Sequence, residues 1–136
     1  MNRRKDPGTY ALVIYLPNAQ TIRVGKLGAF KFSRGYYLYI GSAMNGLTTR
    51  IVRHMSDDKI KHWHIDYLLE HALVKQLWTH QGDERFECLW AQAALALPKA
   101  RIVVPHFGSS DCNCATHLVY FGNRPPETLK DESNRR

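Results

Sequence analysis

The sequence predicts an α+β fold, in which a small, mainly antiparallel sheet is flanked by about three helices. Short apolar runs of strand length alternate with longer runs whose apolar residues recur every three or four positions. The chain has 136 residues, 44% of them hydrophobic and 23% charged, which indicates one globular domain with a modest core. We place this domain at residues 8–122, between a basic leader (1–7) and a flexible tail (123–136).

Strand signals fill the first third of the chain and return later. The first apolar run ends at Pro17-Asn18, a turn signal, and glycine-containing turns separate the next three. These four runs are residues 10–16, 21–24, 29–32 and 36–40. Their short connections predict an antiparallel meander. Further strands are expected over residues 73–80, 101–104 and 117–121.

Amphipathic runs predict three helices, over residues 47–55, 65–72 and 86–97. The buried stripe of the first helix is expected to be Leu47, Ile51 and Met55. Ser42 or Asn45 is available as the N-cap of the first helix, and Asp83 as that of the third.

The charge of the chain favours a polyanionic partner. Its net charge is +7, and eight basic residues but only two acidic ones lie between positions 22 and 62. Nucleic acid is therefore the expected partner, and the alternative is a basic surface without a ligand. No apolar run approaches the roughly 20 residues that span a bilayer, and no secretory signal is evident. A membrane protein is thus excluded, and a reducing, cytoplasmic location is expected.

Three cysteines, Cys88, Cys112 and Cys114, are too few and odd in number for a disulfide framework, so free thiols are expected. Cys112, Cys114, Asp111 and His117 carry zinc-compatible side chains. However, the single residue between the two cysteines differs from the usual C-x₂₋₄-C knuckle, which argues against a structural zinc ion.

Two short strings carry the chemistry. Gly8-Thr9-Tyr10 and Tyr39-Ile40-Gly41 lie on apolar strands, and the second leads into the helix that carries Arg50 and His54. Arginine and tyrosine hydroxyls bind phosphate oxygens, and a phenol or an imidazole can move protons. This combination suggests chemistry on a phosphate. The simpler interpretation is half-buried strand tyrosines beside solvated helix residues.

The order of these residues, with Glu87 on a later helix, resembles the GIY-YIG endonuclease superfamily, and most of all its Uri-type branch. Several strings are similar to an uncharacterised family of that branch, which is sometimes attached to endonuclease III-like glycosylases. They are Tyr39-Ile-Gly-Ser-Ala43, Arg50-Ile-Val-Arg-His54, Trp63-His-Ile-Asp-Tyr67, Glu87-Cys88 and Phe107-Gly-Ser-Ser-Asp-Cys-Asn-Cys114. The resemblance spans Gly8 to Phe121 and implies a metal-dependent endonuclease that hydrolyses phosphodiester bonds in DNA, in repair or processing.

The resemblance also implies a role for each candidate catalytic residue. Tyr10 would help deprotonate the attacking water, and Tyr39 would orient the water or the scissile phosphate. Arg50 would stabilise charge on the phosphoryl oxygens, and His54 would assist proton transfer or phosphate contact. Glu87 would bind Mg²⁺ or Mn²⁺. A free tyrosine has a pKa of about 10, so a base role requires nearby positive charge. Glu84, three residues before Glu87, is an alternative ligand.

Further basic residues are expected to contact nucleic acid, namely Lys26, Lys31, Arg34, Arg53, Lys61 and His64. DNA is the expected substrate, and RNA stays open. Trp63 either stacks on a base or packs at the start of its helix. Because the chain carries one module, a homodimer or a DNA-repair protein is a candidate partner. The loop that holds Asp111 and His117 is expected beside Glu87, in contact with substrate.

The chain departs from the superfamily pattern between its two tyrosines. Tyr10 and Tyr39 are 29 positions apart, and an inserted hairpin from Thr21 to Phe32 would explain this spacing and bring Lys26 and Lys31 near the site. The lysine that some members carry after the first tyrosine is absent. A nucleic-acid-binding module with little catalytic activity is therefore the main alternative function. A third candidate is a zinc-stabilised interaction domain.

Overall fold

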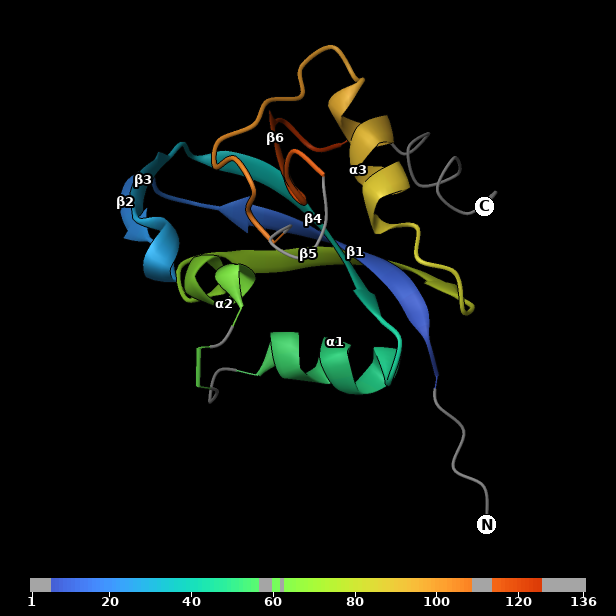
Figure 1. The fold of residues 1–136 in the computed structure, drawn as a ribbon. Coiled ribbons are helices and arrows are strands. Elements are labelled where there is room, and N and C mark those ends of the chain that lie inside the picture. Colours follow the sequence, from blue (N-terminus) through green and yellow to red (C-terminus); the bar gives the residue numbers. More distant parts are fainter. Residues whose placement is uncertain (1–5, 57–59, 62, 109–113, 126–136) are drawn as a thin grey trace.

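A computed structural model describes residues 6–56, 60–61, 63–108 and 114–125. Within these ranges it has a four-stranded antiparallel sheet, a two-stranded sheet and three α-helices, which confirms the α+β prediction (Figure 1). The strands are β1 (Gly8–Leu16), β2 (Gln20–Arg23), β3 (Ala29–Phe32), β4 (Gly35–Ala43), β5 (Leu73–Gln81) and β6 (Leu118–Gly122). The helices are α1 (Leu47–Met55), α2 (His64–Leu69) and α3 (Glu87–Leu95), with a 3₁₀ turn, η1, at Gly25–Leu27.

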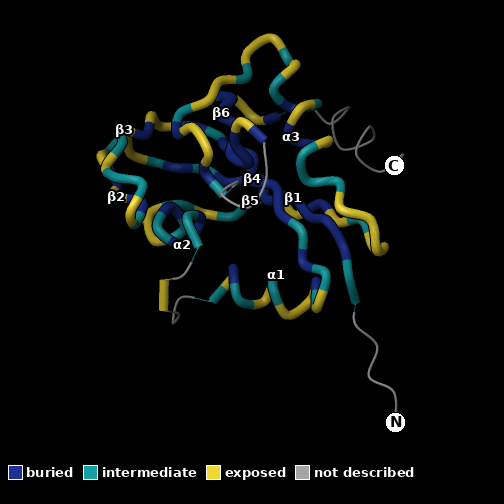
Figure 2. Tube along the Cα trace, viewed as in Figure 1, coloured by how far each residue is buried: buried dark blue, intermediate teal, exposed yellow. Residues whose placement is uncertain are grey.

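The main sheet is built around strand β1. Its order is β5-β1-β4-β6, and each neighbouring pair is antiparallel. The β1–β4 ladder runs from the pair Gly8 and Ala43 to the pair Leu16 and Gly35. Both strands are buried along most of their length (Figure 2). Long apolar strands with neighbours on both sides are the expected form of a central sheet position.

The predicted meander is wrong, and the predicted inserted hairpin is confirmed. Strands β2 and β3 pair only with each other and form the two-stranded sheet. A meander would place β2 beside β1, but β1 already hydrogen-bonds to β4 on one side and to β5 on the other. The hairpin still belongs to the core, since Ile22, Val24 and Phe32 are buried.

The side chains of β1 alternate between two hydrophobic layers. Tyr10 and Leu12 face the layer that is covered by α1, α2 and the β2–β3 hairpin. Ala11 and Val13 face the opposite layer, which includes Trp90 of α3. Figure 1 shows α1 and α3 on opposite sides of the main sheet. The sheet therefore separates α1 from most of α3.

The N-terminal end of α1 is capped by Asp6, which precedes β1, and not by a residue of the loop before the helix. Neither Ser42 nor Asn45 caps the helix. Instead, the Asp6 carboxylate accepts a hydrogen bond from the Thr48 amide at 2.9 Å, and the Asp6 carbonyl accepts one from the Leu47 amide at 2.7 Å. Hydrogen bonds from the Thr48 side chain and the Thr48 amide lower the pKa of the Asp6 carboxyl group. The two amide bonds also satisfy donors that a helix start leaves open. Asp6 is thus part of the fold, although we placed it in the leader.

Three smaller predictions differ from the structure. Helix α3 begins at Glu87 and has no side-chain cap, so Asp83 is not its N-cap. Residues 101–104 contribute a single bridge, between Arg101 and Tyr120, and not a strand. Met55 is 47% exposed, and His54 is the buried residue of the last turn of α1. None of the helices in the described ranges is long and apolar enough to cross a membrane.

Candidate functional site

The centre of the candidate site is a hydrogen-bonded pair, Tyr10 of β1 and His54 of α1. The Tyr10 hydroxyl lies 2.6 Å from His54 Nε2, and both residues are buried. Gly41, opposite Tyr10 in the β1–β4 ladder, leaves room for this ring. A Cβ atom at position 41 would lie 2.6 Å from the Tyr10 hydroxyl, so a side chain there would displace the tyrosine.

Tyr39 of β4 lies beside this pair. Its ring centroid is 6.3 Å from that of Tyr10 and 6.1 Å from that of His54. Gly108 packs against the Tyr39 ring with φ of 71°, and a Cβ atom there would lie 3.1 Å from the ring. The amide of Gly108 donates to His64 Nδ1 at 2.8 Å, which ties this turn to α2. The two motif tyrosines are thus held in one buried cluster.

Arg50 approaches the cluster from α1 and is supported by Trp63. Its guanidinium donates to the Ser42 carbonyl at 3.2 Å and lies 4.3 Å from the centroid of the Trp63 ring. The Arg53 guanidinium lies at the same distance from that ring. Such cation–π contacts restrict the arginine side chains. Trp63, at the start of α2, therefore packs against two arginines of α1. This agrees with the packing interpretation of Trp63.

Glu87 reaches the site although α3 covers the other face of the sheet. The amide of Phe86 donates to Thr9 Oγ1 at 3.1 Å, and this bond fixes the start of α3 beside the residue that precedes Tyr10. Glu87 Oε2 lies 3.9 Å from His117 Nδ1. Burial is the main reason why the pKa of Tyr10 and that of Tyr39 are raised, and the negative charge of Glu87 adds to both rises. Glu84, the alternative ligand, is exposed and precedes the helix.

Burial dominates the electrostatics of the two tyrosines. It raises the pKa of Tyr10 to about 12, and the nearby Arg50 guanidinium opposes that rise. Burial also raises the pKa of Tyr39 well above its ordinary value. In the protein alone both phenols are therefore neutral near pH 7. A base role for Tyr10 requires a proton acceptor, which the hydrogen bond to His54 provides, or additional positive charge.

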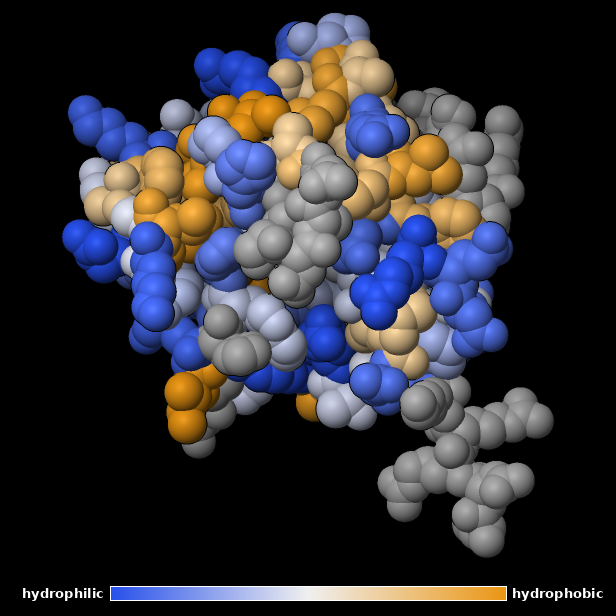
Figure 3. All heavy atoms as spheres, in the orientation of Figure 1, coloured by the Kyte–Doolittle hydropathy of each residue, from blue (hydrophilic) through white to orange (hydrophobic). Residues whose placement is uncertain are grey.

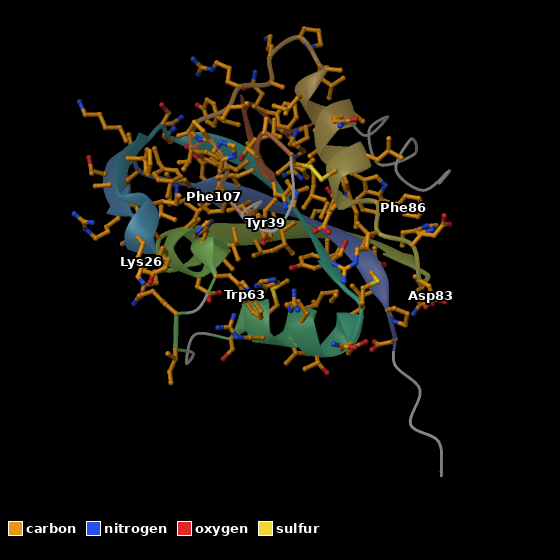
Figure 4. All side chains as sticks on the ribbon, viewed as in Figure 1. Lys26, Tyr39, Trp63, Asp83, Phe86 and Phe107 are labelled. Carbon is orange, nitrogen blue, oxygen red and sulfur yellow. A yellow bond between two sulfur atoms is a disulfide. The ribbon has the colours of Figure 1, made fainter. Side chains whose placement is uncertain are left out.

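The expectation of free thiols is wrong for two of the three cysteines. The sulfur atoms of Cys88 and Cys114 are bonded, and their Cα atoms are 5.7 Å apart (yellow bond in Figure 4). Sequence spacing does not reveal this pair, because it joins the first turn of α3 to a segment 26 residues later. Cys112 and Asp111 lie outside the described residues. His117 lies beside the pair, with Nε2 3.8 Å from Cys88 Sγ.

Three of the residues proposed to bind nucleic acid, Lys26, Lys31 and Arg34, lie on or next to the β2–β3 hairpin. Tyr10 lies at the start of β1, and from there the chain runs about 20 Å along this strand, at roughly 3.4 Å per residue, before it enters the hairpin that carries Lys26 and Lys31. Figure 4 shows Lys26 and Phe86 at opposite ends, with Tyr39 between them. Arg34 also lies at the hairpin end, next to the start of β4. The insertion does not bring these basic residues to Tyr10.

The other three are engaged within the protein. Arg53 forms two hydrogen bonds with the Asp66 carboxylate, of 2.9 and 3.0 Å. Lys61 pairs with the Glu70 carboxylate at 2.8 Å on the surface. His64 accepts the Gly108 amide, and burial lowers the pKa of its imidazole. The charge of Arg53 is therefore already paired inside the fold.

The sequence does not indicate the long-range contacts of several residues that build the site. Asp66 is fully buried and pairs with Arg53, and its carboxylate also accepts the Trp63 amide at 2.9 Å. Thr9 anchors α3 through its bond to the Phe86 amide, and no local pattern indicates this role. Cys88 directly follows the candidate ligand Glu87, and this adjacency was a signal for its place near the site.

The comparisons with curated proteins and with solved structures each find no match. A family model described as "Domain of unknown function DUF123" matches residues 9–135, which include every candidate catalytic residue. Because this match covers almost the whole chain, the protein belongs to the DUF123 family.

Proposed function

We propose that this protein is a metal-dependent endonuclease of the GIY-YIG type, which hydrolyses phosphodiester bonds in DNA. The observation that carries the proposal is the convergence of residues from four separate elements around the Tyr10–His54 pair. These are Tyr10 of β1, Tyr39 of β4, Arg50 and His54 of α1, and Glu87 of α3. Such a set of phosphate-binding and proton-transferring groups suits phosphodiester hydrolysis.

The Tyr10–His54 pair supplies a route for a proton. With His54 Nε2 unprotonated, Tyr10 donates to it across the 2.6 Å hydrogen bond. A proton from the attacking water passes to the Tyr10 oxygen as the Tyr10 proton passes to Nε2. This exchange avoids a free phenolate, which burial disfavours. Arg50 binds the phosphoryl oxygens as their negative charge grows.

Glu87 fits a divalent metal ion. Mg²⁺ is often held by only one or two carboxylates, with waters and phosphate oxygens in its other positions. The Glu87 side chain is 19% exposed, so one of its oxygens can bind a metal that is open to solvent. When bound, Mg²⁺ or Mn²⁺ would polarise the phosphoryl group and lower the pKa of a coordinated water.

Charge and composition support our proposals for the partner and the compartment. A basic chain with a net charge of +7 suits DNA, and RNA is tested below. On the face seen in Figure 3, hydrophilic side chains gather over α1, whereas apolar ones gather over α3. We place the protein in the cytoplasm, with a second copy or a DNA-repair protein as the source of further specificity.

The test is cleavage of labelled single-stranded, duplex and flap DNA, and of RNA, with Mg²⁺ or Mn²⁺. We expect the wild type to cut at least one DNA substrate. Glu87→Gln should abolish cleavage, and Tyr10→Phe should lower its rate by about 10²–10⁴-fold. The matched controls are Glu84→Gln and Tyr15→Phe, which remove the same groups outside the site and should cut normally.

A nucleic-acid-binding module with little catalytic activity is the second candidate. It is favoured by one observation, the complete burial of Tyr10. Binding of DNA without cleavage by the wild type under all metal conditions would support this alternative. Equal cleavage by wild type and Glu87→Gln would instead contradict the catalytic assignment.

A further inference from the structure

Three metal-binding side chains meet beside the candidate active site. Cys88 comes from the first turn of α3, and Cys114 and His117 come from the segment that leads into β6. One ligand atom from each residue lies within 4.8 Å of the other two. Two cysteines and a histidine form a typical donor set for zinc.

The orientation of His117 gives a second, independent observation. Its Nε2 atom faces Cys88 Sγ at 3.8 Å, and its Nδ1 atom faces the Glu87 carboxylate at 3.9 Å. Histidines that bind metals through one ring nitrogen commonly donate the other to a carboxylate. In a tetrahedral zinc site, Zn–S and Zn–N bonds of about 2.3 and 2.1 Å place sulfur and nitrogen about 3.6 Å apart. The observed separation is close to this value.

The surroundings of the cluster also suit a bound cation. Cys114 and His117 are 7% and 3% exposed, so a bound metal would be shielded from solvent. Cys88 lies in the first turn of α3, where the helix dipole favours a thiolate. Glu87 adds a carboxylate behind the histidine.

We propose that the reduced protein binds one zinc ion through Cys88, Cys114 and His117, with a water in the fourth position. The disulfide is then the oxidised, metal-free form of the same site. A dithiol reductant gives two electrons and two protons to the disulfide and becomes a disulfide itself. Zinc binding then displaces the two thiol protons into solution.

This zinc site is separate from the proposed Mg²⁺ site. Thiolate and imidazole are ligands for zinc, whereas Mg²⁺ selects carboxylate and water. Glu87 serves the zinc site only through His117. The inference therefore does not depend on nuclease activity, and its test measures metal content and absorption.

The first experiment uses the whole protein. We expect protein reduced with a dithiol and dialysed to carry one zinc per chain, and protein oxidised to the disulfide to carry none. Replacement of zinc by Co²⁺ in the reduced form should give thiolate-to-cobalt charge-transfer absorption and the intense visible bands of a tetrahedral site. Zinc binding in a weakly buffered solution should release about two protons.

Variants then test each ligand. Cys88→Ser, Cys114→Ser and His117→Ala should lose zinc, whereas His71→Gln, at an exposed histidine far from the cluster in sequence, should keep it. Glu87→Gln should weaken zinc binding by about 10–100-fold, because it removes the carboxylate behind His117. Circular dichroism checks that each variant is folded. Reduced wild type without zinc, or with a cobalt spectrum that lacks thiolate bands, would overturn the proposal without bearing on cleavage.

Discussion

The Tyr10 hydroxyl is held in its neutral form by burial, while the Arg50 guanidinium favours the phenolate. Burial is the larger effect, so the phenol keeps its proton well above the pH at which a free tyrosine loses it. Tyr37 and Tyr39 lie in the same layer, and burial raises the pKa of both. Three neutral tyrosines in one core make the fold sensitive to alkaline conditions.

We expect the free energy of unfolding to fall as pH rises from about 10 towards 12. In this interval the unfolded chain loses the Tyr10 proton and the folded chain keeps it, so unfolding is increasingly favoured, by about 1.4 kcal/mol per pH unit for Tyr10 alone. Urea denaturation between pH 8 and 11 measures this change. Tyr10→Phe should make the profile less steep above pH 10, because it removes one of the three tyrosines whose pKa burial raises. Equal profiles for the wild type and this variant would contradict the burial effect.

Helices α1 and α2 are joined by a buried ion pair. The Asp66 side chain is fully buried, and the Arg53 side chain is 26% exposed. Arg53 also contacts Trp63, the ring that supports Arg50. Arg53 thus links α1 to α2 through Asp66, and it contacts the same Trp63 ring that supports Arg50, the candidate phosphate ligand.

Arg53→Met should lower the free energy of unfolding by about 3–5 kcal/mol, because it leaves the Asp66 carboxylate buried without its positive partner. The control is Lys61→Met, which removes an exposed pair with Glu70 and should cost much less, because water and salt screen an exposed pair. Chemical denaturation measures both values. Similar small losses for the two variants would show that the Arg53 pair contributes little to stability.

The elements were predictable where a local pattern determines them. The apolar run of β1 and the alternation of β5 gave both strands, because burial of strand faces leaves a two-residue period in the sequence. Contacts between distant residues leave no such pattern. Three such contacts are the cap of α1 by Asp6, the pairing of Cys88 with Cys114 and the salt bridge of Arg53 with Asp66. Each joins separate segments, so none could be predicted from the sequence.

At the scale of the whole molecule, the candidate site and the inserted hairpin occupy opposite ends of β1. The prediction that the hairpin brings Lys26 and Lys31 near Tyr10 relied on their closeness in the sequence. The insertion is next to the motif in the sequence, but β1 carries the chain away before the insertion begins. If DNA crosses the protein from one end to the other, the hairpin contributes contacts remote from the reacting phosphate.

We expect Lys26→Gln/Lys31→Gln to weaken DNA binding without changing the cleavage rate of bound DNA. Each lost phosphate contact removes about 0.9 from the slope of log K against log salt concentration, so the slope should fall by up to about 2. Fluorescence anisotropy across a salt series measures the slope, and single-turnover cleavage measures the rate. An unchanged slope would show that the hairpin does not contact DNA.

Thr9 and Tyr10 are adjacent on β1 but serve opposite faces of the sheet, since Thr9 anchors α3 and Tyr10 bonds to His54. A strand that gains or loses one residue exchanges its two faces. A single-codon insertion or deletion in β1 would therefore have two effects at once. It would separate Tyr10 from His54, and it would break the bond between Thr9 and the start of α3. In a mutational library selected for function, length changes should be absent from β1 and tolerated in the turn between β2 and β3.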